Sequence, residues 1–542
     1  MKKALSLLLA TAMMLSAAAC GGGNAGTPPS GGGTDPSNTQ SGGDGQQQVA
    51  YKDTFTLATN NDQSIMDGQM NVDNDKILPM VYSQLLKRDL EGNIVGDVAE
   101  TWEVSEDQLT WTFHLRKGVK FHNGKELTAA DVKATYDRLL NEDDPVRYTQ
   151  TMGFIDRCEI VDDYTIQLIT LAPAGPMEAS LTLRANTLLD KDFIDQYGKD
   201  LGTSVETVNG TGPFKLVEWN KDEDMHLVRH DDYFNGPAKT ENIVVQIVPE
   251  AASRSVAIES HQVDAADGLT PEEMVRLKSD PSINVYSIPG PGCHLFQFNC
   301  SHPIVKDTKV RQAISYALDR TAIVDALYGA MGEKPRDSVM PAAAFGYKYL
   351  GVIEQDQEKA RQLLADAGYP DGFDMTVMTT SVYNKGVEMG EIVAAQLAEV
   401  GINVTLDVID KATFSASWNA LTPEEFPDWG MFIMGAGCIT LDGDEGLKRR
   451  FATAADGKNS NNYGFYSNAE VDECLNGAAE TTDKATREKL YQRASEILYL
   501  EDPVGCYMNM RNESCVLSAN VEGFQMTPVG IIDWPNVAVR AD

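Results

Sequence analysis

The stretch that decides the fold reads WTFHLRKGVKFHNGKELTAADV and spans residues 111–132. Apolar and polar side chains alternate over 110–116, which is typical of a half-buried strand. Thr128 precedes a helical pattern and Asp131 follows it by three residues, so the pair predicts a capping box. We therefore expect a strand, a tight turn and a helix over 129–140.

Helical periodicity recurs further along the chain. It predicts helices over 310–318, 357–367, 388–400 and 484–500. A strand over 402–406 follows Gly401, and a helix, a glycine and a strand in succession form a unit of α/β packing. Strands and helices are mixed throughout, so the expected class is α/β or α+β.

The N-terminus begins with a short basic segment and an apolar run that ends at Leu15. Small residues then lead to Cys20, and this pattern resembles the lipobox of bacterial lipoproteins. The resemblance implies a signal peptide over 1–19, cleavage before Cys20 and acylation of its thiol. The alternative is an ordinary secretory signal. Residues 20–50 carry Gly, Ser, Pro and Gln, and are expected to form a flexible, lipid-anchored linker.

The composition after this linker is that of a globular protein. The chain is 42% hydrophobic and 8% aromatic, so it can bury a sizeable core. The formal net charge of −35 argues against nucleic acid as a partner. The eight cysteines leave seven after Cys20, and these lack a CxxC spacing. Free buried thiols are therefore expected, while one or two disulfides remain open.

Further segments are similar, in order, to the extracellular solute-binding proteins of the peptide/nickel import family, which serve ABC transporters. Together they cover about 51–535. The segments are LLKRDLEG (85–92), VAETWEVS (98–105), the stretch 111–132, GTGPFKL (210–216), VRQAI (310–314) with Asp319-Arg320, and ARQLLADAGYP (360–370).

This resemblance implies a periplasmic-binding-protein-like α/β fold with two lobes, an extra subdomain and a ligand held between the lobes. The implied hinge crossings lie near 289–295 and 506–515. The implied divisions are lobe I at 51–89, 194–290 and 511–542, the extra subdomain at 90–193, and lobe II at 291–510.

The resemblance also implies ligand contacts from several separate segments. In its peptide-binding members, exposed main chain pairs with the ligand backbone as an added strand. The matching residues here are Met70, Asn71 and Val72 in lobe I, and Gly435, Ala436 and Gly437 in lobe II. The other implied ligand contacts are Phe296, Gln297, Ser381, Tyr383, Asn384, Lys411, Cys438, Ile439, Thr440 and Asp442.

The sequence departs from the family pattern where peptide binders hold the ligand's α-amino group. Ala436 takes the place of the usual Trp, and Ile439 takes the place of the amine-binding Asp. Asp442 is retained. An apolar side chain cannot neutralise a buried ammonium, and an unpaired buried charge is costly. The fold expectation stands, while the expectation of a free-amine peptide weakens.

Other constellations carry less weight. His226 and His230 alternate with apolar residues like a strand, which favours surface histidines on a hairpin over a metal site. Asp442, Asp444 and Glu445 lack the spacing of a calcium loop. His294 is a weak candidate for binding a nickel complex. A turn is expected at 290–292, and we find no catalytic motif and expect no cofactor.

We therefore expect a receptor and not an enzyme. It would capture an oligopeptide or dipeptide by hinge closure and deliver it to an ABC permease. The alternatives are a modified peptide, opine, sugar or metal chelate on the same fold, or a surface sensor or adhesin without transport. The expected place is the outer face of the cytoplasmic membrane, anchored by lipid, or the periplasm. A monomer is expected.

Overall fold

A computed structural model describes residues 50–541, with gaps at 72–75, 149–151, 417–421 and 454–460. The predicted signal peptide, Cys20, nearly all of the predicted linker and Val72 lie outside the described residues. Within the described part of the chain, no helix is both long and apolar enough to cross a membrane.

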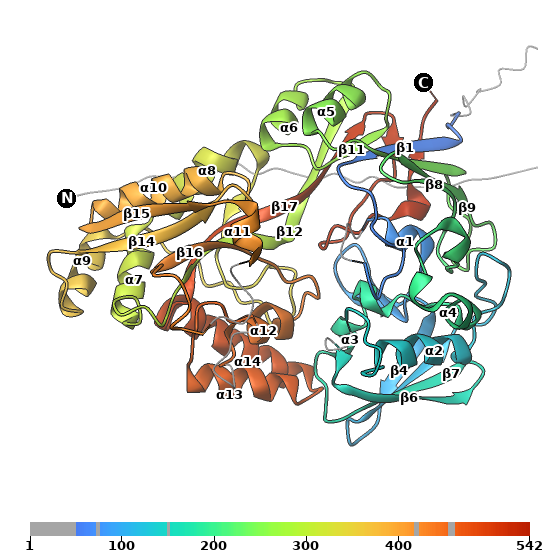
Figure 1. Cartoon of the computed structure of the whole chain (residues 1–542), viewed down its shortest axis with the longest axis horizontal. Helices are drawn as coiled ribbons and strands as arrows, with labels where there is room; N and C mark the ends of the chain where they lie inside the picture. The colour runs from blue at the N-terminus through green and yellow to red at the C-terminus, as the bar shows by residue number, and fades with distance from the viewer. Residues whose placement is uncertain (1–49, 72–75, 149–151, 417–421, 454–460, 542) are drawn as a thin grey trace, which may run out of the picture. The chain divides into compact units, whose positions relative to one another are not determined.

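An eleven-stranded sheet is the central feature of the fold (Figure 1). Its strands follow the order β15-β14-β16-β12-β17-β11-β1-β10-β9-β8, and β13 pairs with β17. The strands are β1 (Thr54–Thr59), β8 (Phe214–Asn220), β9 (Asp224–Arg229), β10 (Asn242–Ile247), β11 (Ala265–Asp267), β12 (Ile283–Phe298), β13 (Lys334–Pro335), β14 (Phe373–Thr380), β15 (Ile402–Ile409), β16 (Met431–Ala436) and β17 (Gly505–Ser518).

Lobe I is the part built on the β1, β8, β9, β10 and β11 end of this sheet. In β1, Phe55 and Leu57 point into a core that the C-terminal Trp534 completes from the far end of the chain. A two-stranded sheet of β18 (Val521–Glu522) and β19 (Ala538–Val539) lies in this C-terminal part. The helices of lobe I are α1 (Leu78–Val81), α4 (Lys191–Tyr197), α5 (Ala251–Glu259) and α6 (Pro271–Leu277).

The extra subdomain has its own four-stranded sheet and its own hydrophobic cluster. The predicted capping box is confirmed, because the Thr128 backbone N–H donates to the Asp131 carboxylate at 3.0 Å. The predicted strand and helix are confirmed as β5 and α2. The elements are β4 (Ala99–Val104), β5 (Thr110–Leu115), β6 (Ile155–Asp162), β7 (Thr165–Thr170), α2 (Ala129–Leu139) and α3 (Met177–Ser180), preceded by the hairpin of β2 (Leu86–Arg88) and β3 (Ile94–Gly96).

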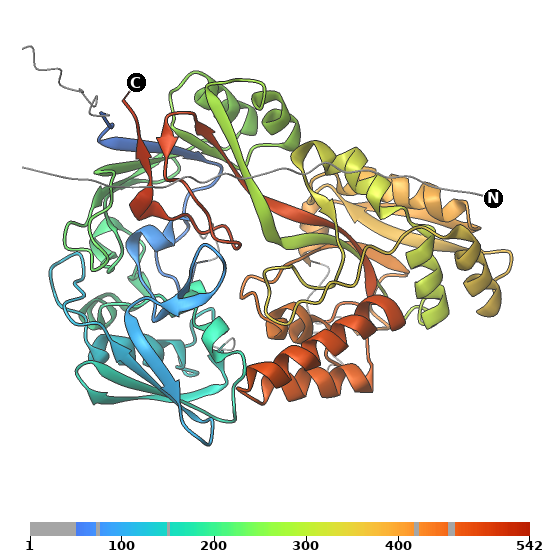
Figure 2. The ribbon, with the colours of Figure 1, turned by 180° about the vertical axis from the view of Figure 1, so that it is seen from behind.

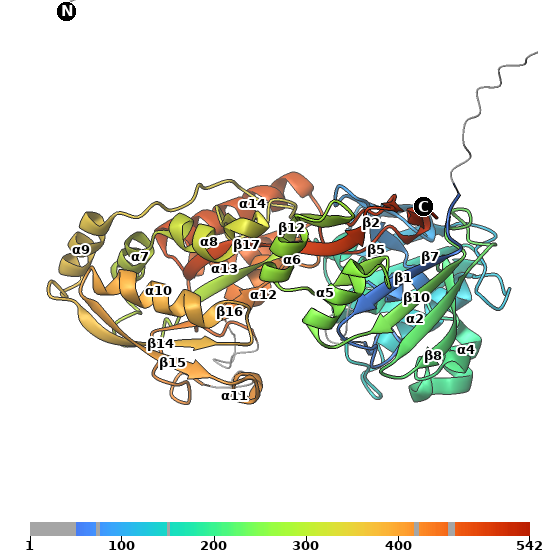
Figure 3. The ribbon, with the colours of Figure 1, turned by 90° about the horizontal axis from the view of Figure 1, so that it is seen from above.

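Lobe II is built on the β14, β15 and β16 end of the sheet, where α10 lies against β14 and β15 (Figure 3). The predicted helices are confirmed as α7, α9, α10 and α14, and the predicted strand as β15. The helices of this lobe are α7 (Thr308–Ala317), α8 (Arg320–Tyr328), α9 (Gln357–Asp366), α10 (Gly386–Ala398), α11 (Lys411–Ala416), α12 (Arg449–Phe451), α13 (Ala469–Ala479) and α14 (Lys484–Glu496).

Two long antiparallel strands, β12 and β17, carry the chain between the lobes (Figure 2). Their register shifts between Pro289 and Cys293, and again before Leu295. The turn predicted at 290–292 is therefore wrong, because these residues lie inside β12 at an irregularity in its pairing. A break in a hydrogen-bond ladder bends a strand locally. The irregularity coincides with the predicted first crossing.

The extra subdomain also contacts lobe II directly, at the turn between α13 and α14. The Gly175 backbone N–H donates to the Ala479 carbonyl at 2.8 Å. Lys484 forms an ion pair with Glu178 at 2.8 Å, and the Thr482 backbone N–H donates to Gln108 at 2.8 Å. These contacts join the extra subdomain to lobe II away from the hinge strands.

The seven cysteines in the described part of the chain are all free, and all except Cys300 are buried. Burial raises the pKa of the Cys158 and Cys515 thiols to about 12, so these groups stay protonated. They behave as small apolar side chains of the core.

Candidate functional site

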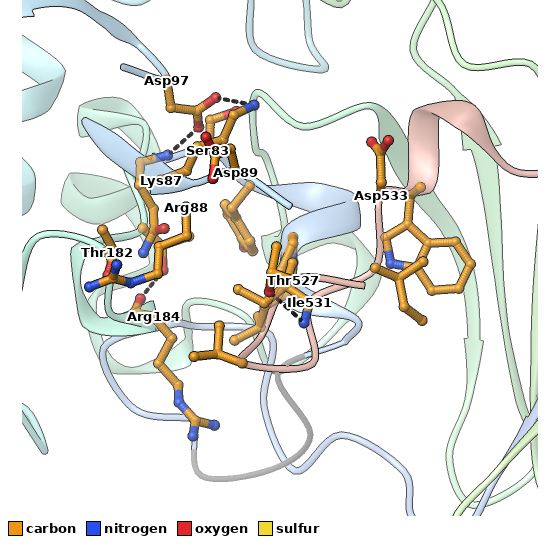
Figure 4. A pocket seen from close by; sticks show the side chains of 18 of the residues that line it. Ser83, Lys87, Arg88, Asp89, Asp97, Thr182, Arg184, Thr527, Ile531 and Asp533 are labelled. Atoms are coloured by element: carbon orange, nitrogen blue, oxygen red, sulfur yellow. Dashed lines mark hydrogen bonds and ion pairs between the residues drawn. The ribbon is translucent and has the colours of Figure 1, made fainter. Parts of the chain in front are cut away.

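A cavity of about 360 Å³ lies between lobe I and the extra subdomain (Figure 4), and one residue of lobe II also lines it. Its walls come from α1, from β2 and the turn after it, and from residues 182–187. The C-terminal residues 527–535 close another side, and Ile439 is the contribution of lobe II. Segments far apart in the sequence thus converge on one space.

The inner wall of the cavity is apolar and is held in place by hydrogen bonds. Leu78, Ile532 and Trp534 line it, and all three are buried. The Trp534 indole N–H donates to the Lys76 carbonyl at 2.8 Å, and the Tyr82 hydroxyl donates to the Met66 carbonyl at 2.7 Å. Aromatic rings fixed at their polar ends form a preformed apolar surface of the kind that binds small ligands.

Charged side chains lie on the polar side of the cavity (Figure 4). Lys87 and Asp97 form an ion pair at 3.1 Å. Arg88 donates to the carbonyls of Gly92 and Thr440, so its guanidinium links the β2–β3 hairpin to lobe II. Burial lowers the pKa of Arg88, and no carboxylate of the described residues lies within 4.0 Å of it.

A second surface lies on lobe II, next to the hinge. The Tyr383 ring covers Gly435, where an added Cβ would lie 3.0 Å from Cε1 of the tyrosine. Tyr383 also contacts Phe414 and His294, with ring centroids 5.5 and 5.6 Å apart. His294 stacks on Tyr328 at 5.7 Å. This aromatic cluster brings the 381–384 loop, α11 and the end of β16 together.

Burial lowers the pKa of His294 to about 3, so its imidazole is uncharged at neutral pH. Its Nδ1 lies 3.0 Å from the Asn509 side-chain oxygen, so this nitrogen is already engaged in a hydrogen bond within the protein. The described residues contain no group of three or more His, Cys, Asp or Glu side chains placed to hold a metal ion. The weak prediction of a nickel-complex ligand at His294 gains no support from these contacts.

Several residues implied as ligand contacts fall on this lobe II surface. Ser381, Asn384 and Lys411 are exposed, and Tyr383 is half-buried between them. The Asn384 carbonyl accepts a hydrogen bond of 2.6 Å from Tyr328. The loop and the helix therefore present polar groups beside the aromatic cluster.

Other implied contacts lie in the core. Phe296 and Gln297 are buried in β12, which is flanked by β16 on one side and β17 on the other. A strand in the middle of a sheet covered on both faces has no side that a solute can reach. Cys438 is also buried, and its thiol donates to the Asp442 carbonyl at 3.3 Å.

The lobe I segment implied as a backbone partner is only half described. Met70 is 39% exposed, whereas Asn71 is fully buried. The Asn71 amide donates to Gln63 at 3.0 Å, and its carbonyl accepts from Tyr148 at 2.9 Å. Its side chain and carbonyl therefore hold the loop in shape and are engaged within the protein.

Asp442 lies apart from both surfaces. Its carboxylate accepts two hydrogen bonds, of 2.8 and 2.9 Å, from one terminal nitrogen of Arg487. The side chains are 4% and 5% exposed. A ligand amine could reach this carboxylate only by displacing Arg487. The suggestion that Asp442 receives the amine is therefore disfavoured by its geometry.

Ile439, by contrast, is 40% exposed and lines the cavity. The adjacent Thr440 is buried, and its backbone N–H donates to Glu445 at 2.7 Å. Glu445 is thus a carboxylate close to Ile439, and the sequence had pointed to it only as a rejected calcium ligand. An apolar side chain at the mouth of an apolar cavity extends its hydrophobic surface.

Sequence reasoning did not single out Arg88, Arg184 or the C-terminal wall at 527–535, which line the cavity. It also missed Arg450, which donates to the Gly437 carbonyl, and Arg511, which lies beside Gly292. Arg88 lies in the segment 85–92, which supported the family resemblance through its turn and was not considered as part of the site. Arg511 stands in the predicted second crossing. No local pattern marks the C-terminal wall, because its role depends on contact with α1.

The two histidines considered for a metal belong to the β8–β9 hairpin and its end, as predicted. His230 is 2% exposed, and its Nδ1 lies 3.1 Å from the Gly212 carbonyl. Its ring meets His122 edge-on at 5.0 Å. The expectation of surface histidines is wrong for His230, which is buried. It holds for His226, whose side chain is 37% exposed.

Known proteins with similar sequences and structures share this architecture. Heme-binding protein A of Haemophilus influenzae is 29% identical over 501 residues, covering 85% of this chain and 87% of that protein. The dipeptide-binding protein of Escherichia coli K12 is 28% identical, covering 82% and 86%. The structure of HbpA2 from Haemophilus parasuis superposes with a TM-score of 0.80 at 27% identity, covering 90% of this chain and all of that one.

The family model for the middle part of bacterial extracellular solute-binding proteins, family 5, matches residues 93–458. This range includes the extra-subdomain sheet, the first hinge strand and most of lobe II. It therefore spans the elements that position the cavity mouth and the aromatic cluster. The chain belongs to family 5 of the bacterial extracellular solute-binding proteins.

Proposed function

We propose that this chain captures a dipeptide-like or modified peptide solute between its lobes and delivers it to the permease of an ABC importer. Family 5 proteins are substrate-binding receptors of such importers and not enzymes. The observation that carries the proposal is the apolar cavity whose mouth is formed by Ile439 of lobe II and whose walls belong to lobe I and the extra subdomain. A ligand there contacts parts that move relative to one another when a hinge closes.

The proposed ligand class follows from the cavity and from the relatives. The names of similar proteins include binders of dipeptide, glutathione and heme. A cavity of about 360 Å³ has the size of a small-molecule site. Ile439 favours a solute without a free α-amino group at that point. A non-peptide solute with an apolar part is the second candidate, and the same residue supports it.

The proposed mechanism is hinge closure along β12 and β17. A ligand that contacts both lobes binds the closed form more tightly and shifts the population toward it. The irregular pairing between Pro289 and Leu295 supplies a place where the strands can bend. We also propose that the divisions expected at 51–89, 90–193, 194–290, 291–510 and 511–542 are the parts that move.

The first prediction tests capture and closure together. Saturation with N-acetyl-Met-Leu is expected to reduce the radius of gyration in small-angle scattering. It should also raise the melting temperature, since a ligand at 100 times its Kd stabilises the bound state by about 2.7 kcal/mol. A rise in melting temperature with an unchanged scattering curve would contradict closure. Native mass spectrometry of the chain purified from its own cells identifies the physiological solute.

The second prediction concerns the proposed lipid anchor at Cys20, which supports a place outside the cytoplasmic membrane. Cys20→Ala is expected to abolish acylation and to move the chain from the membrane to the soluble fraction. Cys158→Ala is the control, because Cys158 is a buried core thiol. The measurements are membrane fractionation and the mass of the mature N-terminus. A wild-type chain that begins elsewhere, without acyl groups, would contradict the anchor.

A further inference from the structure

We propose that Arg511 receives an anionic group of the captured solute, with Arg450 as a second cation beside it. The inference rests on the proposed function and names a chemical requirement of the ligand. The ligand would then carry a carboxylate, or a similar anion, at the hinge end of the site and an apolar part in the cavity.

The position of Arg511 is set by the two hinge strands. It lies on β17, beside the irregular stretch of β12 between Pro289 and Cys293 that contains Gly292. A Cβ added to Gly292 would lie 3.7 Å from both Cδ and Nη1 of Arg511, and 3.8 Å from the Ala436 carbonyl. The side chain of Arg511 therefore extends across the glycine toward the end of β16. It is exposed there, next to the lobe II surface.

No carboxylate neutralises this guanidinium in the described residues, since none lies within 4.0 Å of it. The charge of Arg511 lowers the pKa of Glu333 slightly, but the Glu333 carboxylate accepts a hydrogen bond from the Asn509 amide at 2.5 Å and forms no ion pair with Arg511. Burial raises the pKa of Glu333, and Arg511 offsets only a small part of that rise. Arg511 is therefore a cation without an ion pair on a surface that the hinge brings toward lobe I.

Arg450 provides the second charge. It lies on α12, and its Nη2 donates to the Gly437 carbonyl at 3.4 Å. Its Nε is buried and has no hydrogen-bond partner among the described residues. Burial raises the pKa of Tyr383, and the fields of Arg450 and Arg511 both offset part of that rise. Both guanidiniums thus act on the same tyrosine.

The space beside these two cations is open. A Cβ added to Gly437 would meet no atom within 4 Å. Ile439 is two residues further along, so its Cα lies within about 7 Å of that of Gly437. A solute with its anion near Ala436 and its apolar part past Ile439 therefore needs to span about three residues of chain, or roughly 10 Å. A dipeptide-sized molecule has this length.

The chemistry favours a carboxylate. Guanidinium groups form paired, charge-assisted hydrogen bonds with carboxylates. Closure of the lobes removes water from the site, which strengthens the attraction between the charges. An uncharged amide offers one acceptor oxygen and adds two donors that face the guanidinium unfavourably. The solute's anion is therefore expected to contribute about ten- to a hundredfold in affinity.

The experiment uses the full chain and two probes that differ only at their C-terminus, N-acetyl-Met-Leu and its C-terminal amide. Calorimetry is expected to show that the wild-type chain binds the carboxylate about ten- to a hundredfold more tightly. Arg511→Gln should reduce this ratio to near one, and Arg450→Gln should reduce it in part. Arg449→Gln is the matched control, because it removes the same charge from an exposed neighbour on α12 and should leave the ratio unchanged.

The outcomes separate this inference from the proposed function. Tight binding of both probes with equal affinity overturns the inference and leaves the receptor function in place. A carboxylate preference that survives Arg511→Gln, in a variant with an unchanged melting temperature, overturns the assignment to Arg511. If neither peptide binds, the peptide-like ligand class fails. Ligand-detected NMR with hexanoate and hexanamide then tests the anion alone, and a lack of preference there also overturns the inference.

Discussion

Asp442→Asn is expected to lower the free energy of unfolding of the chain by about 3–5 kcal/mol, because it leaves Arg487 as a buried charge without a counter-ion. The two side chains are only 4% and 5% exposed. Although burial acts to lower the pKa of Arg487, the carboxylate of Asp442 raises it overall. The substitution is isosteric, so the loss reports the charge and not a change of volume. The free energy of unfolding is measured by denaturation with guanidinium chloride.

Apart from Asp442, the hydrogen-bonding and ring contacts of Arg487 among the described residues are uncharged, and burial raises the pKa of the nearby Asp444. The remaining contacts of Arg487 are the Ala478 carbonyl at 3.1 Å, the Tyr491 hydroxyl at 3.2 Å and the face of the Phe345 ring at 5.1 Å. None of them is an anion. A guanidinium in such a site requires its carboxylate, which is why removing one partner of a buried pair costs more than removing both.

Two further variants make this prediction decisive. The double variant Asp442→Asn with Arg487→Met removes both charges and should recover most of the lost stability. Asp231→Asn breaks an exposed pair, Arg229–Asp231 at 2.8 Å, and should cost no more than about 1 kcal/mol. A loss of solute binding by Asp442→Asn at unchanged stability would contradict the structural role and would restore Asp442 as a ligand contact.

Local signals explain what the sequence predicted well. The strand β5 and the helix α2 follow from alternation and from a capping box, and both depend on residues within a few positions of each other. Short-range patterns of this kind determine an element without knowledge of its partners. The two hinge crossings implied by the family resemblance, by contrast, did not come from local patterns, and they fall within β12 and β17.

Features that depend on distant partners could not be predicted. The contact of Arg88 with the Thr440 carbonyl joins residues 352 positions apart. The Gly-Pro-Gly sequence at 290–292 predicts a turn when it is considered alone. In the structure it lies inside β12, because its conformation depends on the register between β12 and β17. Phe296 is a related case, because it is buried in β12 although the resemblance implied a ligand contact. In a strand covered on both faces, alternation cannot tell a ligand-facing side chain from a core one.

The cavity illustrates both cases in one site. Ile439 was singled out by counting along a family motif, and it does line the cavity. The opposite wall at 527–535 carries no motif and reaches the segment before α1 only through the fold, where the Trp534 indole N–H donates to the Lys76 carbonyl. Sequence comparison therefore finds the residue that differs from the relatives, whereas the structure is needed to find what that residue faces.

Ile439→Asp is expected to reverse the preference of the site between free and acylated peptides. In the wild-type chain, N-acetyl-Met-Leu should bind more tightly than Met-Leu, because Ile439 gives a ligand ammonium no anion at the cavity mouth. The new carboxylate supplies one. A charge-assisted hydrogen bond contributes about 1.5–3 kcal/mol, so the affinity ratio should change by about ten- to a hundredfold in favour of Met-Leu.

The site makes this substitution tolerable and the readout specific. Ile439 is 40% exposed, so an aspartate there keeps contact with water and should fold normally. Ile439→Asn is the matched control. Asparagine has the same shape as aspartate without the charge, so this variant should not favour the peptide with the free amine. Calorimetry with both peptides on all three chains gives the ratios.

One competing carboxylate near Ile439 is Glu445, which accepts from the Thr440 backbone N–H at 2.7 Å, and Asp89, Glu91, Asp97 and Asp533 line the cavity itself. Tight wild-type binding of Met-Leu that is lost in Glu445→Gln would show that Glu445 receives the amine and that Ile439 does not exclude it. Tight wild-type binding of Met-Leu that survives Glu445→Gln would place the amine elsewhere. A preference for the acetylated peptide, reversed by Ile439→Asp and unaffected by Ile439→Asn, would establish that position 439 selects solutes whose amine is blocked or absent.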